Sequence, residues 1–311
     1  MSRWFVLSAL ALAGVIVSGS AARAQHRGKQ PPYAVQGSVS TPVLILENVV
    51  STEAHEFAIG FTLNGHTLFF NRATDDRKII RLMHSRYGRG WAEPVQAPFS
   101  DDKWRDLDPV PHPDGEHIYF SSNRPLEGDT PTDFDTWYVE WREGYWGDPM
   151  NAGEVVNSDS SDVYVSFTGN GDMYFGSRRD TSSARRIYVS KSAGGELQPP
   201  ELVELVIAGK YPAVGNPCIA HDGSYIIFAA EGEVGEADLF IARHNGGRWG
   251  PGRNLGAGIN SEFNDYAPSI SPDGRYLFFT SERPGIVFEI PEGAKDPGDI
   301  YMIDLTAVIT R

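Results

Sequence analysis

Five stretches of this chain share one pattern: Asn or Asp, then Gly, then a short apolar or aromatic run. They read FTLNGHTLFF, PHPDGEHIYF, FTGNGDMYF, AHDGSYIIF and SPDGRYLFF, and their turn glycines are spaced by 50, 56, 52 and 51 residues. A two-residue turn between twisted strands needs a positive φ angle, which Asn-Gly and Asp-Gly adopt readily. The pattern therefore predicts five β-hairpins, one in each copy of an internal repeat.

Each repeat continues in the same way after its hairpin. A polar loop leads to a third β-rich run, and a Gly-rich turn leads to a fourth run that begins near Trp91, Trp146, Leu197 or Trp249. Four antiparallel strands in about 50 residues are typical of one blade of a β-propeller. We therefore predict an all-β, five-bladed β-propeller.

The two ends of the repeat region complement each other. The fifth repeat stops at residues 303–305 without a fourth strand, whereas residues 39–50 (VSTPVLILENVV) resemble a fourth strand that precedes the first hairpin. We expect this N-terminal strand to complete the last blade and close the ring, which would leave no open sheet edge. A β-sandwich predicts neither five repeats at a spacing of about 50 residues nor this complementarity of the two ends. The predicted propeller domain is 39–311, preceded by an N-terminal linker at 25–38.

The first 24 residues have the pattern of a secretory signal peptide. Arg3 is followed by the apolar run Phe5–Val17 and then by Ala22-Arg23-Ala24, a small-x-small cleavage pattern that places the cut before Gln25. A membrane anchor would need about 20 apolar residues, more than this run offers. We expect a periplasmic or secreted protein.

Charge and cysteine content narrow the possible partners. The chain has 27 basic and 41 acidic residues, a net charge of -14. Such a surface repels nucleic acid and anionic membranes. Cys218 is the only cysteine, so no internal disulfide is possible, which is compatible with a bacterial periplasm or cell surface.

The repeat also resembles a known family. The pattern P-x-h-S-P-D-G-x-x-h-x-F-x-S-x-R, in which h is apolar, occurs at 268–283 and, with small changes, at 109–124. It resembles the WD-like repeat of TolB-type propellers. The segment 246–285 is similar to propeller segments of bacterial envelope proteins that also carry a peptidoglycan-binding domain of the outer-membrane-protein-A type. The resemblance implies a propeller over residues 40–305. TolB itself has six blades and an additional N-terminal domain, so its partners are not carried over.

An acidic residue recurs nine positions before four of the five turn glycines. The four acids are Glu56, Asp106, Asp162 and Asp265, and Val214 takes the fifth place. Because the first strand of a blade lines the central channel, these acids would lie near one channel mouth. They could bind a cation, a basic side chain or a polyol. They could instead pair with an arginine that recurs in the same repeats, and we favour this structural interpretation. The arginines are Arg72, Arg124, Arg179 and Arg283.

Residues that differ between repeats are better candidates for binding than repeated ones. His55, Arg105 and Asn264 stand one position before the acids, and Asp108 and Tyr164 stand two positions after them. Together with the four acids they form the predicted ligand-binding set at the channel mouth. Two such carboxylates could alternatively catalyse glycosidic bond cleavage as general acid and base.

The remaining histidines follow no metal-binding spacing, so we expect no metal and no cofactor. The favoured function is a binding or protein-interaction module of the bacterial envelope, acting as a monomer on a protein or glycan. A carbohydrate-active enzyme, hydrolase or lyase, is the alternative, and an envelope scaffold is a third possibility. The repeat-breaking loops 123–135 and 284–299 are further candidate contact regions.

Overall fold

The computed structural model describes residues 30–180, 184–286 and 297–310. Residues from Pro31 onward belong to one compact unit, to which the following description applies. The predicted signal peptide at 1–24 lies outside the described residues. No helix in the described part of the chain is long and apolar enough to cross a membrane.

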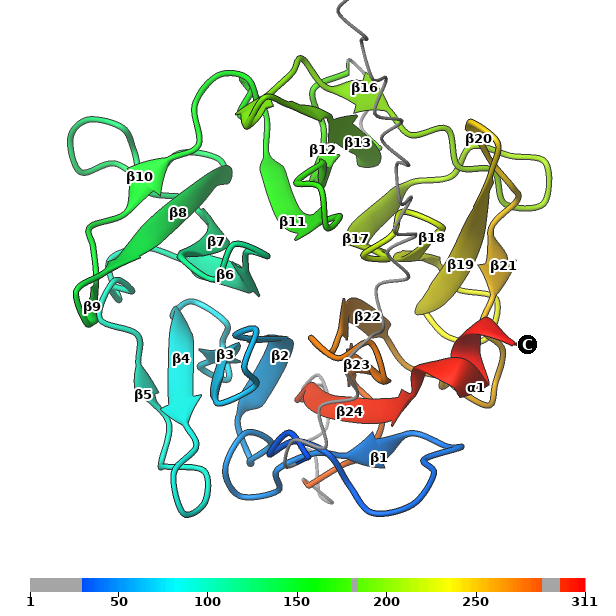
Figure 1. The fold of residues 1–311 in the computed structure, drawn as a ribbon, viewed down its shortest axis with the longest axis horizontal. Helices are drawn as coiled ribbons and strands as arrows, with labels where there is room; N and C mark the ends of the chain where they lie inside the picture. Colours follow the sequence, from blue (N-terminus) through cyan, green and yellow to red (C-terminus); the bar gives the residue numbers. More distant parts are fainter. Residues whose placement is uncertain (1–29, 181–183, 287–296, 311) are drawn as a thin grey trace, which may run out of the picture. The chain divides into compact units, whose positions relative to one another are not determined.

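Five antiparallel sheets form the predicted five-bladed propeller (Figure 1). Blade 1 contains β2 (His55–Phe61), β3 (Thr67–Ala73), β4 (Ile80–Arg86) and β5 (Val95–Gln96). Blade 2 contains β6 (Asp106–Pro111), β7 (His117–Ser122), β8 (Asp135–Arg142), β9 (Tyr145–Trp146) and β10 (Met150–Asn151). Blade 3 contains β11 (Asp162–Phe167), β12 (Met173–Ser177), β13 (Arg186–Ser190) and β16 (Glu201–Leu202), with the small β14 (Ser192–Ala193) and β15 (Glu196–Leu197) hairpin beside them.

Blade 4 contains β17 (Val214–Ile219), β18 (Tyr225–Glu231), β19 (Ala237–Asn245), β20 (Arg248–Trp249) and β21 (Arg253–Asn254). Blade 5 contains β22 (Asp265–Ile270), β23 (Tyr276–Ser281), β24 (Asp299–Asp304) and β1 (Val43–Leu44). The first strands of the blades, β2, β6, β11, β17 and β22, contact one another in this order, and β22 contacts β2 again. These five strands surround the central channel (Figure 1).

The five predicted turns join the first and second strands of their blades. Their glycines all have positive φ angles, between 68° and 88°. In blade 2 the N–H of His112 donates to the carbonyl of His117, and the N–H of Gly115 donates to the carbonyl of His112. Asn or Asp before Gly therefore specifies the hairpin locally, as expected from the sequence.

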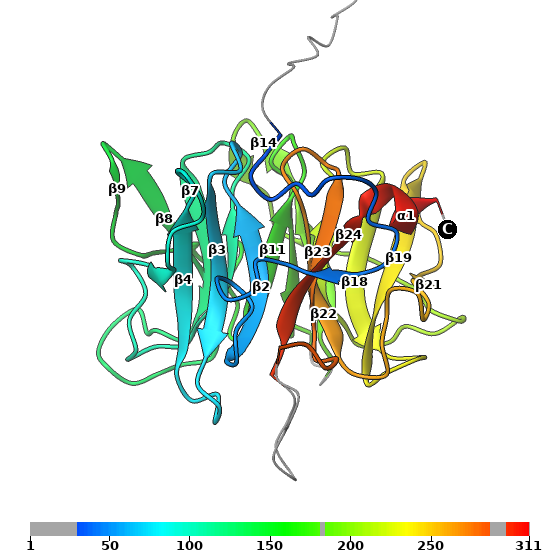
Figure 2. The ribbon, with the colours of Figure 1, turned by 90° about the horizontal axis from the view of Figure 1, so that it is seen from below.

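The N-terminal strand closes the ring. β1 pairs antiparallel with β24, with Val43 opposite Met302, and the N–H of Ile45 donates to the carbonyl of Ile300 over 3.1 Å. Figure 2 shows β1 lying across β24. The strand is shorter than the predicted 39–50, because Leu46 and Asn48 adopt positive φ angles and turn the chain away.

The segment predicted as a linker includes a residue of the core. Tyr33 is buried, and its ring centroid lies 4.7 Å from that of Phe61 and 5.9 Å from that of Phe278. Blades 1 and 5 thus share an aromatic cluster with the residues that precede β1.

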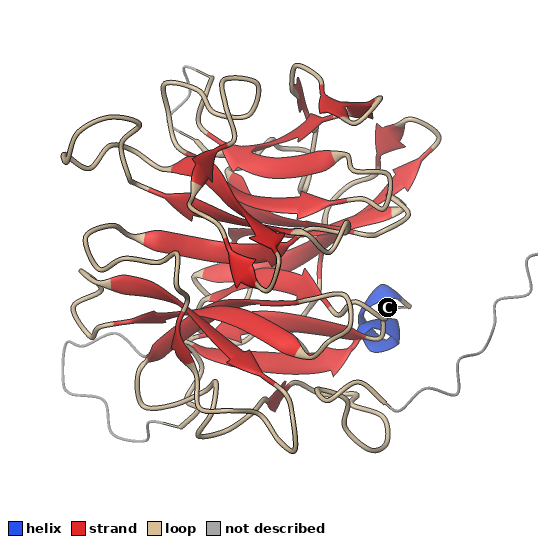
Figure 3. Ribbon diagram, turned by 60° about the vertical axis from the view of Figure 1, so that its left-hand side comes forward, coloured by secondary structure: helices blue, strands red, loops and turns tan. Residues whose placement is uncertain are grey.

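The core lies between neighbouring sheets, where side chains of the second strands are fully buried. Phe70, Phe120, Phe175, Phe228 and Phe278 occupy corresponding strands of the five blades. Almost all regular structure in the described residues is strand (Figure 3), and the exception is the short helix α1 (Leu305–Ile309). This packing of sheet on sheet excludes water without disulfides, and Cys218 is a buried thiol.

Each first strand contains a β-bulge two residues after the position of the repeated acid. The register shifts there in all five blades. The residues at the bulge have φ angles between 48° and 56°. They are Ala58, Asp108, Tyr164, Asn216 and Ala267. A bulge redirects a strand and its side chains, and these five residues occupy the same position on the five strands that surround the channel.

Candidate ligand-binding site

The four repeated acids are fully buried, and each pairs with the arginine that recurs in its blade. The oxygen–nitrogen distances are 2.7 Å for Glu56–Arg72 and Asp106–Arg124, and 2.8 Å for Asp162–Arg179 and Asp265–Arg283. The structure thus contains the acid–arginine ion pairs that we favoured over a ligand-binding role for these acids.

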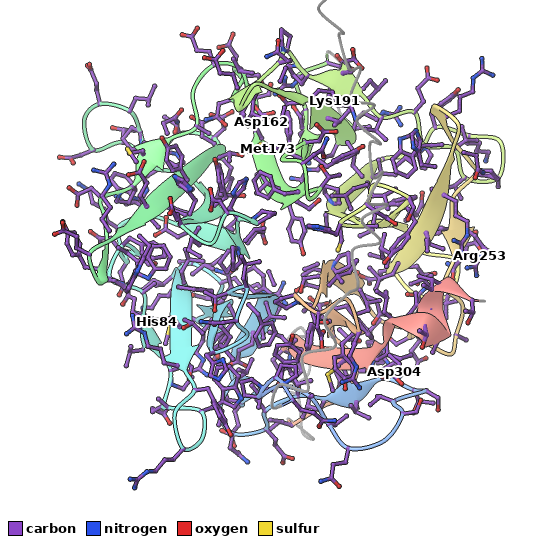
Figure 4. All side chains as sticks on the ribbon, in the orientation of Figure 1. His84, Asp162, Met173, Lys191, Arg253 and Asp304 are labelled. Carbon is purple, nitrogen blue, oxygen red and sulfur yellow. The ribbon has the colours of Figure 1, made fainter. Side chains whose placement is uncertain are left out.

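Blade 3 shows what such a pair does. Asp162, labelled in Figure 4, accepts hydrogen bonds from the N–H and the hydroxyl of Ser158 at 2.6 and 2.7 Å. Its partner Arg179 also donates to the hydroxyl of Ser177 and to the carbonyl of Val156. The pair therefore ties the start of the first strand to the second strand and to the segment that enters the blade. The four acids line neither of the two channel cavities described below.

Blade 4 lacks this arrangement. Val214 stands in place of the acid, Ala230 in place of the serine opposite it, and Gly232 in place of the arginine. Blade 4 thus has small uncharged residues where the other blades have a buried ion pair. Of these residues, Val214 and Ala230 line the channel mouth.

A cavity of about 580 Å³ occupies this mouth, and we call it the mouth cavity. Its walls come from the starts of the first strands, the ends of the second strands, and the segments that lead from there to the third strands. Apolar groups such as Phe57, Leu107 and Tyr266 line it together with small residues of blade 4. Its charged lining residues are Arg77, Arg105, Arg178, Arg185, Glu231 and Glu282.

Arginines dominate the charge of the mouth cavity. Arg77 forms an ion pair with Glu282 at 3.0 Å. Arg105, Arg178 and Arg185 form no ion pair with any of the described residues. In a protein with a net charge of -14, this is a local concentration of positive charge. An anionic group entering the cavity would be attracted to it.

Arg185 lines the mouth cavity and packs against glycines of both blade 3 (Gly176) and blade 4 (Gly215). At three other blade junctions, a side chain from the second strand accepts a hydrogen bond from the bulge N–H of the next blade. These acceptors are Asn71, Ser121 and Thr280. The corresponding residue of blade 3 is Gly176, and a Cβ atom there would lie 3.2 Å from Cδ of Arg185. Arg185 therefore occupies space that a larger residue would fill.

Electrostatics at Arg185 favour an anion nearby. Burial, and secondarily the charge of Arg178, lower the pKa of Arg185, whereas Asp108 raises it. The Nε atom of Arg185 is buried and has no hydrogen-bond partner among the described residues. The charge of the exposed Arg178 therefore repels that of the half-buried Arg185, and a bound anion would relieve this repulsion.

His55 is a neutral member of the mouth cavity. Burial, with a contribution from Arg77, lowers its pKa to about 3. Its Nδ1 accepts a hydrogen bond from the N–H of Gly298 at 2.5 Å, and its Nε2 lies 3.4 Å from the hydroxyl of Tyr266. His55 therefore anchors the rim and can serve as a neutral polar contact.

A smaller cavity of about 140 Å³ lies at the other end of the channel, next to the hairpin turns, and we call it the turn-side cavity. Asp108 and Tyr164 line it. Burial raises the pKa of Asp108 to about 7, even though Arg185 acts in the opposite direction. The hydroxyl of Tyr164 donates to the carbonyl of Pro268 across the channel at 2.9 Å.

The nine predicted ligand-binding residues thus separate into three groups. His55, Arg105 and Asn264 line the mouth cavity, and Asp108 and Tyr164 line the turn-side cavity. The four repeated acids lie inside the blades in ion pairs.

Sequence reasoning did not single out Arg77, Arg178 or Arg185 as site residues. Two features of the sequence could have pointed to them. Val214 replaces the repeated acid in blade 4, and blade 3 contains two pairs of adjacent arginines, 178–179 and 185–186. The first arginine of each pair lines the mouth cavity.

Comparisons with known proteins establish the fold and no closer relationship. No protein-family profile and no curated protein matches the sequence. A thermostable family-43 glycoside hydrolase matches with a TM-score of 0.53 and 12% identity, over 83% of this chain and 91% of the other. Xylan β-1,4-xylosidase from Bacillus halodurans C-125 matches with a TM-score of 0.50 and 16% identity, over 83% of this chain and 54% of the other.

A putative TolB from Agrobacterium tumefaciens matches with a TM-score of 0.49 and 16% identity, over 81% of this chain and 91% of the other. Both TolB-type proteins and family-43 enzymes are therefore among the similar structures. The shared feature is the fold. Because propellers serve as binding modules and as enzymes, the function must be argued from the site.

Proposed function

We propose that this chain is an exported binding module of the bacterial envelope, whose ligand places a carboxylate in the mouth cavity. The observation that carries the proposal is the set of three arginines, Arg105, Arg178 and Arg185, that have no ion-pair partner among the described residues. A guanidinium group binds a carboxylate through two parallel, charge-assisted hydrogen bonds.

The ligand class follows from the lining of the cavity. Apolar walls formed by Phe57, Leu107 and Tyr266 stand beside the arginines. Such a cavity suits an acidic sugar or the end of a peptide, which offers both an anionic group and a less polar surface. Location in the periplasm or outside the cell is part of this proposal, supported by the N-terminal sequence pattern.

A second candidate function is supported by Asp108. A buried carboxyl with a pKa of about 7 can act as a general acid at neutral pH. A glycoside hydrolase of this fold would need a second carboxylate at a suitable separation, and Glu231 and Glu282 line the mouth cavity. The ion pair of Glu282 with Arg77 and the position of Asp108 at the other cavity make binding the better-supported function.

Binding can be tested with acidic ligands and their neutral counterparts. Oligogalacturonate and peptides with a free terminal carboxylate are compared with methyl-esterified oligogalacturonate and amidated peptides by isothermal titration calorimetry. We expect binding of at least one acidic ligand, weakened about tenfold or more by Arg105→Gln or Arg178→Gln, since a charge-assisted hydrogen bond contributes roughly 1.5–3 kcal/mol.

Arg253→Gln is the matched control, because Arg253 is exposed and lies at the outer edge of blade 4, away from the channel (Figure 4). Equal affinity of wild type and the mouth variants for every acidic ligand would contradict the proposal. Turnover of a polysaccharide that is abolished by Asp108→Asn would favour the enzyme.

A further inference from the structure

The hairpin turn of blade 2 differs from its four counterparts at two positions. Three residues before the turn glycine, blades 1, 3 and 5 carry a hydroxyl that bonds to the Asn or Asp before the glycine. These bonds are Thr62–Asn64 at 3.0 Å, Thr168–Asn170 at 2.5 Å and Ser271–Asp273 at 2.6 Å. Blade 2 has His112 at this position, and His117 two residues after the glycine.

The two imidazoles of this hairpin converge on one carboxylate oxygen. Nδ1 of His112 lies 2.8 Å from Oδ2 of Asp114, and Nδ1 of His117 lies 2.6 Å from the same oxygen. The other oxygen, Oδ1, accepts hydrogen bonds from the backbone N–H groups of Glu116 and His117. The turn therefore fixes the carboxylate through one oxygen and presents the other to both histidines.

His112 and His117 can each offer a ring nitrogen and Asp114 a carboxylate oxygen, and these three atoms lie within 4.8 Å of one another. Two imidazoles and one carboxylate are a common ligand set for zinc and related divalent transition metals. Asp114 is exposed and the two histidines are half-buried, so an ion has access from solvent.

The surroundings of the histidines fit a metal site. Nε2 of His117 faces Oε1 of Glu140 at 3.6 Å, and a carboxylate at the second ring nitrogen commonly orients a histidine ligand. The ring of His112 packs edge-on against Phe167, with centroids 4.4 Å apart. Both rings are thus restrained before any ion binds.

We propose that His112, Asp114 and His117 bind a divalent transition-metal ion, with zinc as the preferred ion. Three protein ligands leave a coordination position for water or for a group of a bound ligand. Pro113, between His112 and Asp114, lines the turn-side cavity, so the ion would lie at the rim of that cavity. The site is independent of the mouth cavity and of the function proposed for it.

The sibling blades supply substitutions that the turn tolerates. Thr62 and Thr67 occupy the places of His112 and His117 in blade 1, and Asn64 occupies the place of Asp114. The variants His112→Thr with His117→Thr, and Asp114→Asn, therefore remove ligands while keeping residues that already form this hairpin. Asp273→Asn is the matched control, because Asp273 occupies the same turn position without histidine neighbours.

The experiment uses the full chain without a histidine tag, stripped of metal with a chelator and titrated with Zn²⁺ by isothermal titration calorimetry. We expect one ion per chain for wild type and for Asp273→Asn. We expect affinity to fall more than about tenfold in the double threonine variant and in Asp114→Asn, since even outer-shell partners are worth about that much. The proposal is overturned if wild type binds no zinc, because the Asp114 carboxylate would then only stabilise the turn. It is also overturned if the double threonine variant binds zinc as tightly as wild type does.

Discussion

Arg185 of blade 3 lies directly against Gly215 of blade 4, where a Cβ atom would come within 3.3 Å of its Cδ. Gly215 faces the mouth cavity, next to Asn216 at the bulge of the first strand. The absence of a side chain at this glycine thus leaves room for the half-buried side chain of Arg185.

The first prediction concerns this contact. Gly215→Ala should destabilise the protein by about 1 kcal/mol, because the added methyl group would force the packed side chain of Arg185 to shift. In an Arg185→Ala background the same substitution should cost less than about 0.5 kcal/mol, since the two effects are coupled. Urea unfolding of the four proteins measures the coupling. Gly88→Ala is the control, because nothing lies within 4 Å of a Cβ atom there. Additive effects of the two substitutions would contradict the proposed contact.

The second prediction concerns the pH dependence of stability. The pKa of Asp108 is about 7 in the folded protein and 3.8 ordinarily, so between these values the folded state binds more protons than the unfolded state. Stability therefore decreases as pH rises through this window. Asp108→Asn should have little effect at pH 4, and should raise the free energy of unfolding relative to wild type by up to about 4 kcal/mol at pH 8.

Asparagine suits this position, because Asn216 occupies the equivalent bulge of blade 4 with a φ angle of 48°. Urea unfolding at pH 4, 6 and 8 makes the measurement, with the exposed Asp75→Asn as control. A difference between variant and wild type that is the same at all three pH values would show that ionisation of Asp108 is not its source.

The third prediction concerns the buried acid–arginine pairs. Arg179→Met should destabilise the protein by about 3–5 kcal/mol, because it leaves the carboxylate of Asp162 buried without its partner. Adding Asp162→Val should recover part of this loss, as the corresponding Val214 of blade 4 needs no arginine. The control is Lys78→Met, which removes an exposed pair with Asp76 and should change stability by less than about 1 kcal/mol. Chemical unfolding at pH 7 distinguishes these outcomes.

The fourth prediction concerns ring closure. Ile45 is buried and its N–H donates to the carbonyl of Ile300. Ile45→Ala should therefore destabilise the protein by about 2–5 kcal/mol. The control is Val43→Ala, in the same strand. Because Val43 is 38% exposed, this substitution should change stability by less than about 1 kcal/mol. Equal, small effects at both positions in thermal unfolding would mean that the N-terminal strand contributes little to the fifth blade.

Much of the fold was predictable because its signals are local. An Asn-Gly or Asp-Gly pair determines its own hairpin, and five repeats spaced by 50 to 56 residues imply one blade each. Ring closure by the N-terminal strand followed from a strand missing at one end and an unpaired one at the other. The pairing of Asp162 with Arg179 was also predictable, because both residues recur with the repeat and lie in the same blade.

Only the tertiary structure showed which charged groups reach the mouth cavity. The sequence placed the four acids near the channel mouth and favoured their pairing with arginines, and these ion pairs lie inside the blades. Arg178 and Arg185, which the sequence did not single out, line the cavity together with the predicted Arg105. Similarly, His112 and His117 have no metal-binding spacing in the sequence, yet the hairpin brings both to Asp114. The physical reason is the same in both cases. Strand periodicity is encoded by neighbouring residues, whereas a binding site is formed by side chains whose separation depends on how strands pair and blades pack.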